Sequence, residues 1–365
     1  MELPAFALDH WLAKYDFATP PIAYNLASST GPRWSVDALA RLGNEPLALD
    51  DIVLSYAPPQ GTTRVREAVA AFHNVDPDWV VMTTGASEAL TILLCLASRP
   101  GANVVIPDPA YPAYAALAQT YGMSVRSYGM LNANGFVQDP DAILAAVGPN
   151  TVAVILNTPH NPTGVVMARD KIEAVAAALA ERSIPLLVDE VYHPLYFGAP
   201  QGSAAGIANV VVMSDLSKAL SLPGLRTGWI IEPNAKQREK IINARSYFTI
   251  SGSPLIERLA THALHHRQVI LDHLQTVAEG NLAQLSALIE MSDGLLRWTR
   301  PHGGTTCFPW FADGRDSRPF CQALADAGLL IAPGDCFGHP SHLRIGFAQQ
   351  AEGFDEAVAR IKALL

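Results

Sequence analysis

The sequence predicts an α/β protein with two parts, a large domain built on a mostly parallel sheet and a smaller α+β domain. Three observations favour this class. Between about residues 63 and 232, short runs rich in β-branched residues alternate with stretches of helical spacing. The runs are apolar on both faces, which is typical of parallel strands covered by helices on both sides in a three-layer αβα arrangement. Beyond about residue 290, three short strand patterns and two helix patterns replace this regular alternation, which favours a separate α+β domain.

Five strands of the large domain can be placed along the chain. They are expected at residues 80–84 (VVMTT), 103–107 (NVVIP), 151–156 (TVAVIL), 185–190 (PLLVDE) and 209–215 (NVVVMSD). Helical stretches lie between them: ASEALTILLCLASR follows the first strand and RDKIEAVAAALAER follows the third. Strands that alternate with helices in this way indicate parallel pairing.

The remaining chain is expected to build the second domain. Residues 233–290 carry helical spacing without strand signals and predict long linking helices. In the tail, RWTRP, TTCFPWF and HLRIGFA predict strands, with helices at 316–327 and 352–364. We therefore expect an N-terminal segment at 1–45 that joins the small domain, a large domain at 46–245, and linking helices with the small domain at 246–365.

Composition excludes several classes of protein. Of 365 residues, 49% are hydrophobic and 16% charged, so the chain can bury a large core and is not disordered. A net charge of −9 argues against a nucleic-acid-binding protein, whose affinity rests on clustered basic residues. The four cysteines form no CxxC pair, which predicts reduced thiols and no metal site. We find no signal peptide and no membrane helix, and we expect a cytoplasmic protein.

Polar or small residues follow the predicted strands. They come at 85–87 (GAS), 108–112 (DPAYP), 157–164 (NTPHNPTG), 189–192 (DEVY) and 214–218 (SDLSK). Ligands of open α/β sheets bind beyond the carboxyl ends of the strands. These residues therefore predict one shared site.

Each motif has an ordinary interpretation beside a functional one. Gly85-Ala86-Ser87 is either a plain helix start or a phosphate site, with Arg226 as the charged partner. HNPTG is either a surface turn or a turn that presents the Asn161 amide to a ligand. Asp189 either caps the next turn or pairs with a cation. No GxGxxG or GxxxxGK motif is present, so dinucleotide and triphosphate sites lack their fingerprints.

Lys218 lies in an apolar segment, SKALSLPGLR. Burying a lysine is costly unless its charge is neutralised or its amine is used covalently. A surface lysine beside an apolar patch is the alternative. The residue alone does not decide between the two.

Together and in this order, the motifs resemble those of the fold-type I pyridoxal-phosphate enzymes, specifically the class I/II aminotransferase family. The most specific pieces are NTPHNPTG, DEVY, and SK followed by PGLRTGW. Supporting pieces are SYAPPQGTTRVREA, TTGASEAL, PDPAYPAY and PGDCFGHPSHLRIGFA. The resemblance covers nearly the whole chain and implies pyridoxal 5′-phosphate as cofactor and the aminotransferase fold of type I.

The resemblance also implies roles at the cofactor ring. Lys218 would carry the cofactor as a Schiff base and move the substrate proton. Asp189 would keep the ring nitrogen protonated. Asn161 and Tyr192 would bond the ring hydroxyl, and Tyr111 would stack on the ring.

Further roles concern the phosphate and the substrate. The phosphate would be bound by Gly85, Ala86, Ser87, Ser217 and Arg226. Tyr56 would reach the phosphate from the other subunit, which implies a homodimer. Arg344, with Asn161 beside it, would bind the substrate α-carboxylate, because a planar guanidinium fits a carboxylate with two parallel hydrogen bonds. The substrates would be an L-amino acid and a 2-oxo acid.

Two departures from the family pattern stand out. Asp215 occupies a position that usually carries a hydroxyl, and Ser214 or Ser217 could take over its contact. In PHGGTTCFPWF, small polar residues at 305–307 replace the usual bulkier ones and suggest an unusual substrate pocket. A dicarboxylate substrate would need a second cation, for which Arg33 and His302 are candidates.

Two other functions compete with transamination. The same cofactor also supports elimination, oxidation or ring closure, as in enzymes similar to capreomycidine synthase, and the GGTTCFPW stretch keeps this option open. A non-catalytic regulator with the same fold is a second alternative, but such proteins usually carry an added DNA-binding segment, and no basic arm is present here.

Overall fold

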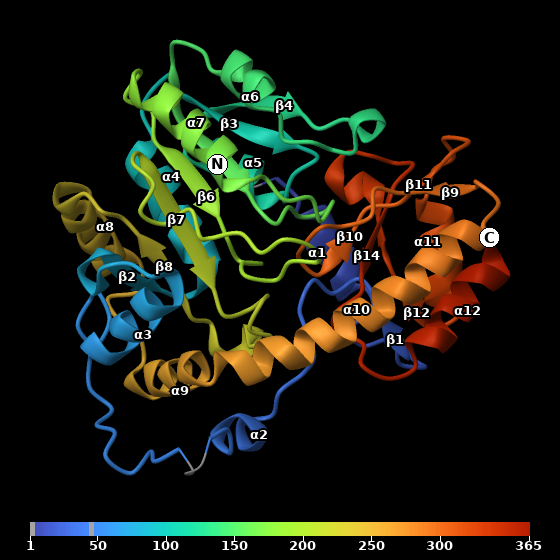
Figure 1. Ribbon diagram of the computed structural model, residues 1–365, viewed down its shortest axis with the longest axis horizontal. Helices are drawn as coiled ribbons and strands as arrows, with labels where there is room; N and C mark the ends of the chain where they lie inside the picture. The colour runs from blue at the N-terminus through green and yellow to red at the C-terminus, as the bar shows by residue number, and fades with distance from the viewer. Residues whose placement is uncertain (1–3, 44–46) are drawn as a thin grey trace.

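The computed structural model describes residues 4–43 and 47–365, and its centre is a seven-stranded sheet (Figure 1). The strand order is β2-β8-β7-β6-β5-β3-β4, and only β8 runs antiparallel to its neighbours. The strands are β2 (Val80–Thr83), β3 (Asn103–Asp108), β4 (Ser124–Gly129), β5 (Thr151–Asn157), β6 (Leu186–Asp189), β7 (Val210–Asp215) and β8 (Gly228–Ile231). The predicted α/β class with a mostly parallel sheet is confirmed.

The five predicted strands are present, and two further ones were not predicted. β4 lies at the edge of the sheet and is largely exposed, so its sequence, SVRSYG, carries no apolar run. β8 has only four residues, GWII, and the first two of them belong to PGLRTGW, the stretch that follows the lysine in the predicted motif.

Helices cover both faces of the sheet. One layer contains α4 (Gly85–Ala97), α5 (Ala113–Thr120) and α8 (Ala235–Phe248), and the other contains α3 (Thr63–His73), α6 (Pro140–Ala146) and α7 (Arg169–Ala180). Neighbouring strand residues point to opposite layers, as the pleat requires. Ile155 belongs to the apolar cluster on the side of α4, α5 and α8, whereas Val154 and Leu156 belong to the cluster on the side of α3, α6 and α7. This is the predicted three-layer arrangement.

A smaller group of strands lies beside the large sheet. It comprises β1 (Tyr24–Asn25), β9 (Leu296–Arg297), β10 (Thr306–Cys307), β11 (Trp310–Phe311), β12 (Leu329–Leu330), β13 (Ala332–Pro333) and β14 (Leu343–Gly346). The helices of this part are α1 (Ala7–Ala13), α11 (Arg318–Asp326) and α12 (Phe354–Leu364). β1 pairs with β12, so the N-terminal segment packs against the C-terminal part of the chain.

Further helices join the two parts or fill the connections. The long helix α10 (Arg267–Met291) runs from the large sheet to the small strands, preceded by α9 (Pro254–His265) (Figure 1). The remaining elements are α2 (Val36–Ala40) and the short 3-10 helices η1 (Pro77–Trp79), η2 (Asn132–Asn134), η3 (Pro223–Leu225) and η4 (Gly334–Phe337).

The predicted domain boundaries stay predictions. The first, at 45/46, falls on residues outside the described ranges, and the second, at 245/246, falls within α8. No helix among the described residues is long and apolar enough to cross a bilayer.

Candidate active site

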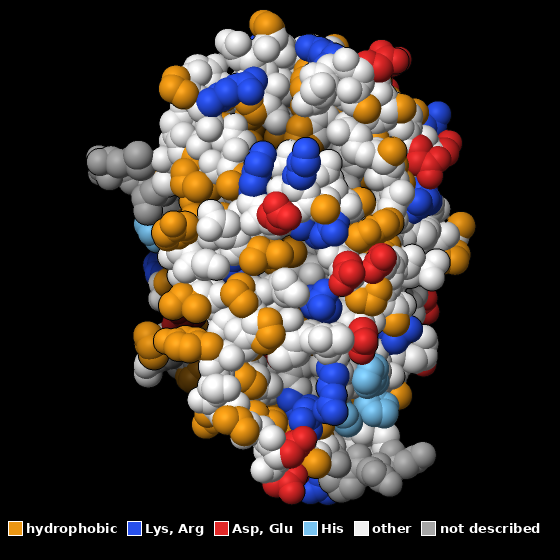
Figure 2. All heavy atoms as spheres, turned by 90° about the vertical axis from the view of Figure 1, so that its left-hand side faces the viewer, with side chains coloured by type: hydrophobic (Ala, Val, Ile, Leu, Met, Phe, Trp, Pro, Cys, Tyr) orange, Lys and Arg blue, Asp and Glu red, His pale blue; other side chains and the backbone are white. Residues whose placement is uncertain are grey.

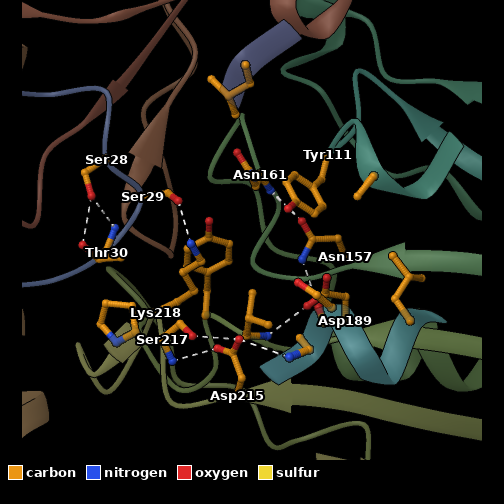
Figure 3. Close-up of a pocket in the computed structure, with 18 of the residues that line it drawn as sticks. Ser28, Ser29, Thr30, Tyr111, Asn157, Asn161, Asp189, Asp215, Ser217 and Lys218 are labelled. Carbon is orange, nitrogen blue, oxygen red and sulfur yellow. Dashed lines mark hydrogen bonds between the residues drawn. The ribbon is translucent and has the colours of Figure 1, made fainter. Parts of the chain in front are cut away.

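A cavity of about 360 Å³ lies where the carboxyl ends of the central strands meet the N-terminal segment and β14 (Figure 3). Its volume is in the range of sites for small ligands. The predicted site residues that line it are Ala86, Ser87, Tyr111, Asn161, Asp189, Tyr192, Ser217, Lys218, Arg226 and Arg344. The structure thus brings together residues that are far apart in the sequence.

Two of the predicted site residues, Gly85 and Tyr56, do not line the cavity. Gly85 begins α4 with a φ of +77°, and a Cβ at this position would lie 2.5 Å from Nη2 of Arg226. A side chain here would therefore collide with the guanidinium group. Tyr56 is 82% exposed and does not line the cavity of its own chain. Its predicted role requires a second subunit.

Lys218 follows β7 and points into the cavity. Its Nζ donates a hydrogen bond to Oγ of Ser29 at 2.8 Å (Figure 3). Burial lowers the pKa of Lys218, and the Asp215 carboxylate acts in the opposite direction as the next largest influence. A lysine with a lowered pKa has more neutral amine at neutral pH, which is the nucleophilic form.

Asp189 ends β6 and is held by two donors. Tyr114 donates its hydroxyl to Oδ2 at 2.6 Å, and the Val191 backbone N–H donates to Oδ1 at 3.1 Å. Burial raises the pKa of Asp189 to about 6, although both hydrogen bonds lower it. Asn157 donates to the Asp189 carbonyl at 3.0 Å and accepts from the Asn161 N–H at 2.7 Å, which couples the two predicted residues.

An anion-binding corner lies at the start of α4. It holds the backbone N–H of Ala86, the hydroxyl of Ser217 and the guanidinium of Arg226. The Asp215 carboxylate accepts from Ala86 N at 3.3 Å and from Ser217 N and Oγ at 2.8 and 2.9 Å. Ser214 donates to the Glu190 carbonyl at 3.1 Å instead. Of the two serines considered for the phosphate contact, only Ser217 lines the cavity.

Arg344 is 2% exposed and lies on β14 with its guanidinium in the cavity. Nη1 donates to Oδ1 of Asn161 at 3.5 Å, and Nη2 donates to the Ala27 carbonyl. Nε has no hydrogen-bond partner within the described ranges. A buried guanidinium with an unused donor suits a carboxylate ligand.

Two tyrosines form the wall between Asp189 and Arg344. Tyr111 packs edge-on against Tyr114 at a centroid distance of 5.7 Å, and burial raises the pKa of Tyr111 to about 12. Burial also raises the pKa of Tyr192, whereas the Arg344 charge and a hydrogen bond with Ser29 lower it. Both phenols are therefore protonated at neutral pH.

Comparisons with known proteins identify the family of the chain. The family described as aminotransferase class I and II matches residues 24–361. The chain belongs to this family. Capreomycidine synthase of Streptomyces vinaceus is 33% identical over 367 residues, covering 98% of this chain and 93% of that protein. A probable aminotransferase of Arabidopsis thaliana is 30% identical over 350 residues, covering 86% and 83%. A solved PLP-dependent aminotransferase from Streptococcus suis has a TM-score of 0.92 at 27% identity, covering 100% and 98%.

Membership of the class I and II aminotransferases confirms the predicted family, the type I fold, the enzyme class and pyridoxal 5′-phosphate as cofactor. The donor set of the cavity fits this cofactor. The anion-binding corner offers a backbone N–H, a hydroxyl and a guanidinium for a phosphate, and Asp189 offers a carboxylate for a protonated ring nitrogen. Lys218 lines the same cavity and offers an amine for the aldehyde.

Several cavity residues of this aminotransferase were not predicted as site residues. Ser28, Ser29 and Thr30 come from the N-terminal segment, which carries no periodic pattern. Asp9 comes from α1. Tyr114 was quoted within PDPAYPAY, but its bond to Asp189 has no local signal.

Residues 305–307 were expected to shape an unusual substrate pocket. None of these three residues lines the cavity. Thr305 Oγ1 donates to the Ser29 carbonyl at 2.8 Å, and Thr306 Oγ1 donates to the Pro162 carbonyl at 3.3 Å. The two hydroxyls therefore stabilise backbone segments next to the cavity without lining the cavity themselves. Neither Arg33 nor His302 lines the cavity, so neither supplies a second cation there in this chain.

Proposed function

We propose that the protein transfers an amino group between an L-amino acid and a 2-oxo acid at the cavity around Lys218. The observation that carries this proposal is the convergence of Lys218, Asp189 and Arg344 on one cavity. An amine, a carboxylate and a buried guanidinium match the three tasks of the reaction: proton transfer, support of the ring nitrogen, and binding of the α-carboxylate.

Each residue has a distinct action in this proposal. Arg344 binds the α-carboxylate and orients the amino acid. Lys218 would move the α-proton of the substrate through Nζ, and Ser29 Oγ holds this nitrogen in place. The Asp189 carboxylate would pair with the ring nitrogen of the bound cofactor and keep it protonated. The bound cofactor supplies the electron sink for this chemistry.

An absorbance spectrum tests the proposal. We expect the purified holoprotein to show a visible band that is absent or altered in Lys218→Ala. An L-amino acid should bleach the band with stoichiometric formation of pyridoxamine phosphate and the 2-oxo acid, and a 2-oxo acid should restore it. A band that no amino acid converts to pyridoxamine phosphate would refute transamination.

A ring-closing reaction is the second candidate. Its support is the 33% identity to capreomycidine synthase over nearly the whole chain. In that case the amino acid would be turned over without stoichiometric pyridoxamine phosphate, and its product would retain the α-amino nitrogen. Mass spectrometry of the same reaction mixture distinguishes the two outcomes.

We further propose a homodimer in which Tyr56 completes the partner's phosphate site. The hydrophobic side chains Val53, Leu54 and Tyr56 are 74–82% exposed. Arg258 ties this segment to α9 through the Ala48 carbonyl and Asp51, both at 2.9 Å. The side of the molecule with α3, α8 and α9 carries many hydrophobic side chains (Figure 2). An exposed apolar surface of this kind is typical of an interface.

Mixing variants tests the dimer. Lys218→Ala and Tyr56→Phe impair different halves of a shared site, so co-refolded subunits should form one site with both defects and one intact site. Activity above that of either parent is expected. Sedimentation as a monomer at micromolar concentration would refute the arrangement.

The free thiols Cys95, Cys307, Cys321 and Cys336 support the further proposal that the protein works in the cytoplasm.

A further inference from the structure

The charged residues that line the cavity are three acids, Asp9, Asp189 and Asp215, and three bases, Lys218, Arg226 and Arg344. The proposed function uses Asp189, Lys218, Arg226 and Arg344. The Asp215 carboxylate already accepts three hydrogen bonds in the anion-binding corner. Asp9 alone of these residues has no assigned task.

Asp9 lies at the mouth of the cavity. α1 is fixed over the site because Trp11 Nε1 donates to the Ile331 carbonyl at 2.9 Å and Phe6 packs edge-on against Tyr111 at 5.9 Å. Asp9 is solvent-exposed, lines the cavity, and has no hydrogen-bond or ion-pair partner within the described ranges. Its carboxylate is therefore available to a ligand.

The electrostatic surroundings of Asp9 connect it to the substrate site. Partial burial raises the pKa of Asp9, and the positive charges of Arg344, His10 and Lys218 lower it. Arg344 and Lys218 are the residues that contact the carboxylate and the α-carbon in the proposed reaction. Asp9 lines the same cavity as these two residues and is the one of the three that is exposed to solvent.

Part of the cavity lining that includes Asp9 is apolar. Leu8 and Leu12 come from α1, and Leu90 and Leu117 come from α4 and α5. An aliphatic chain packs favourably on such a wall, while a charged group at its end seeks a counter-ion. A ligand held by its carboxylate at Arg344 would place the end of a long side chain toward the mouth.

We propose that Asp9 binds the cationic end of the substrate side chain, so that the preferred substrates are L-amino acids with a long basic side chain, of the lysine, ornithine or arginine type. The inference rests on the proposed function in taking Arg344 as the α-carboxylate group. It explains why the cavity mouth carries an acid, whereas a dicarboxylate substrate would meet repulsion there.

Matched pairs of amino acids test the proposal with the holoenzyme. Arginine and citrulline have nearly the same shape, but only arginine is charged, and lysine and norleucine form a second pair. We expect kcat/KM to favour each cationic member by roughly 10-fold or more, which is typical of a charge-assisted hydrogen bond. Asp9→Asn should remove most of this preference and leave norleucine within about twofold.

Asp16→Asn is the matched control, because Asp16 is an exposed acid just beyond α1 that does not line the cavity. It should keep the wild-type preference. A wild-type enzyme without preference for the cationic member, or an Asp9→Asn variant that loses activity on all four amino acids alike, would overturn the proposal. The second result would show that Asp9 only balances the charge of Arg344.

Direct binding separates this proposal from the proposed function. Calorimetric titration of the holoprotein with arginine and citrulline reports binding without turnover. If arginine binds more tightly through Asp9 but no pyridoxamine phosphate forms, transamination fails and the substrate class stands. If pyridoxamine phosphate forms from apolar or acidic amino acids and Asp9→Asn has no selective effect, transamination stands and the substrate class fails.

Discussion

Nζ of Lys218 donates a hydrogen bond to the hydroxyl of Ser29 at 2.8 Å, across 189 positions of sequence. Ser29 in turn is held by the small strands, because its carbonyl accepts from Thr305 Oγ1 at 2.8 Å. The position of the reactive amine therefore depends on packing in a part of the chain that lies outside the large sheet.

Removing the hydroxyl of Ser29 should slow the reaction. Ser29→Ala leaves Nζ of Lys218 without its acceptor, and a hydrogen bond of this kind is worth about 0.5–1.5 kcal/mol, or roughly 2- to 10-fold in rate. Stopped-flow measurement of the first half-reaction gives the rate. Ser29→Thr keeps a hydroxyl and should recover most of it. An unchanged rate in Ser29→Ala would show that the bond does not position the lysine.

Replacing Asp215 should strengthen cofactor binding. Its carboxylate occupies the donors of the anion-binding corner and repels a phosphate, so Asp215→Ser should lower the Kd for pyridoxal phosphate by roughly fivefold or more. Fluorescence titration of the cofactor-free protein measures this Kd, and competition by inorganic phosphate isolates the phosphate contribution. Weaker binding in Asp215→Ser would instead show that the carboxylate orients Ser217 for the phosphate.

Much of the site could be predicted because its residues follow buried strands. Asn161 and Lys218 follow β5 and β7, Asp189 is the last residue of β6, and the carboxyl ends of parallel strands meet at one edge of a sheet. The local sequence therefore indicates both which residue takes part in the site and where along the edge of the sheet it lies. The class of the large sheet follows from the same alternation of strands and helices.

The residues that were missed come from segments placed only by long-range contacts. Ser29 reaches the cavity beside the pairing of β1 with β12, a two-residue contact without any visible alternation in either segment, and Asp9 does so because Trp11 of α1 bonds the Ile331 carbonyl. Tyr114 lies on α5, where a buried tyrosine has the pattern of an ordinary core residue, and only the fold brings its hydroxyl to Asp189. Strands of two residues are too short for a periodic signal.

The stability of the cofactor-free protein should depend on pH through Asp189. Burial raises the pKa of this carboxyl to about 6 in the folded protein, whereas an unfolded aspartate has a pKa near 3.9. Between these values the folded state binds more protons, so the free energy of unfolding falls as pH rises through this window. Asp189→Asn does not titrate and should lack this fall.

Urea unfolding at pH 4.5 and pH 8 measures the effect. Relative to Asp189→Asn, wild type should lose about 2 kcal/mol of stability between the two pH values. Burial raises the pKa of Glu190 to about 7 in both proteins, and the Asp189 charge is the smallest of the influences named for it, so most of the Glu190 contribution cancels in the comparison. A stability difference that stays constant with pH would contradict the raised pKa of Asp189.

Arg344→Lys should weaken substrate binding more than it slows turnover. Lysine keeps the positive charge but loses the planar fork, including the Nε donor that has no partner among the described residues. We expect the KM for the amino acid to rise roughly 10- to 100-fold, as for the loss of charge-assisted hydrogen bonds, with a smaller effect on kcat. The corresponding amine without its carboxylate is the control, because it has nothing for Arg344 to bind, and wild type and variant should bind it alike. If Arg344→Lys weakened binding of the amine as much as that of the amino acid, Arg344 would hold the shape of the cavity rather than the carboxylate.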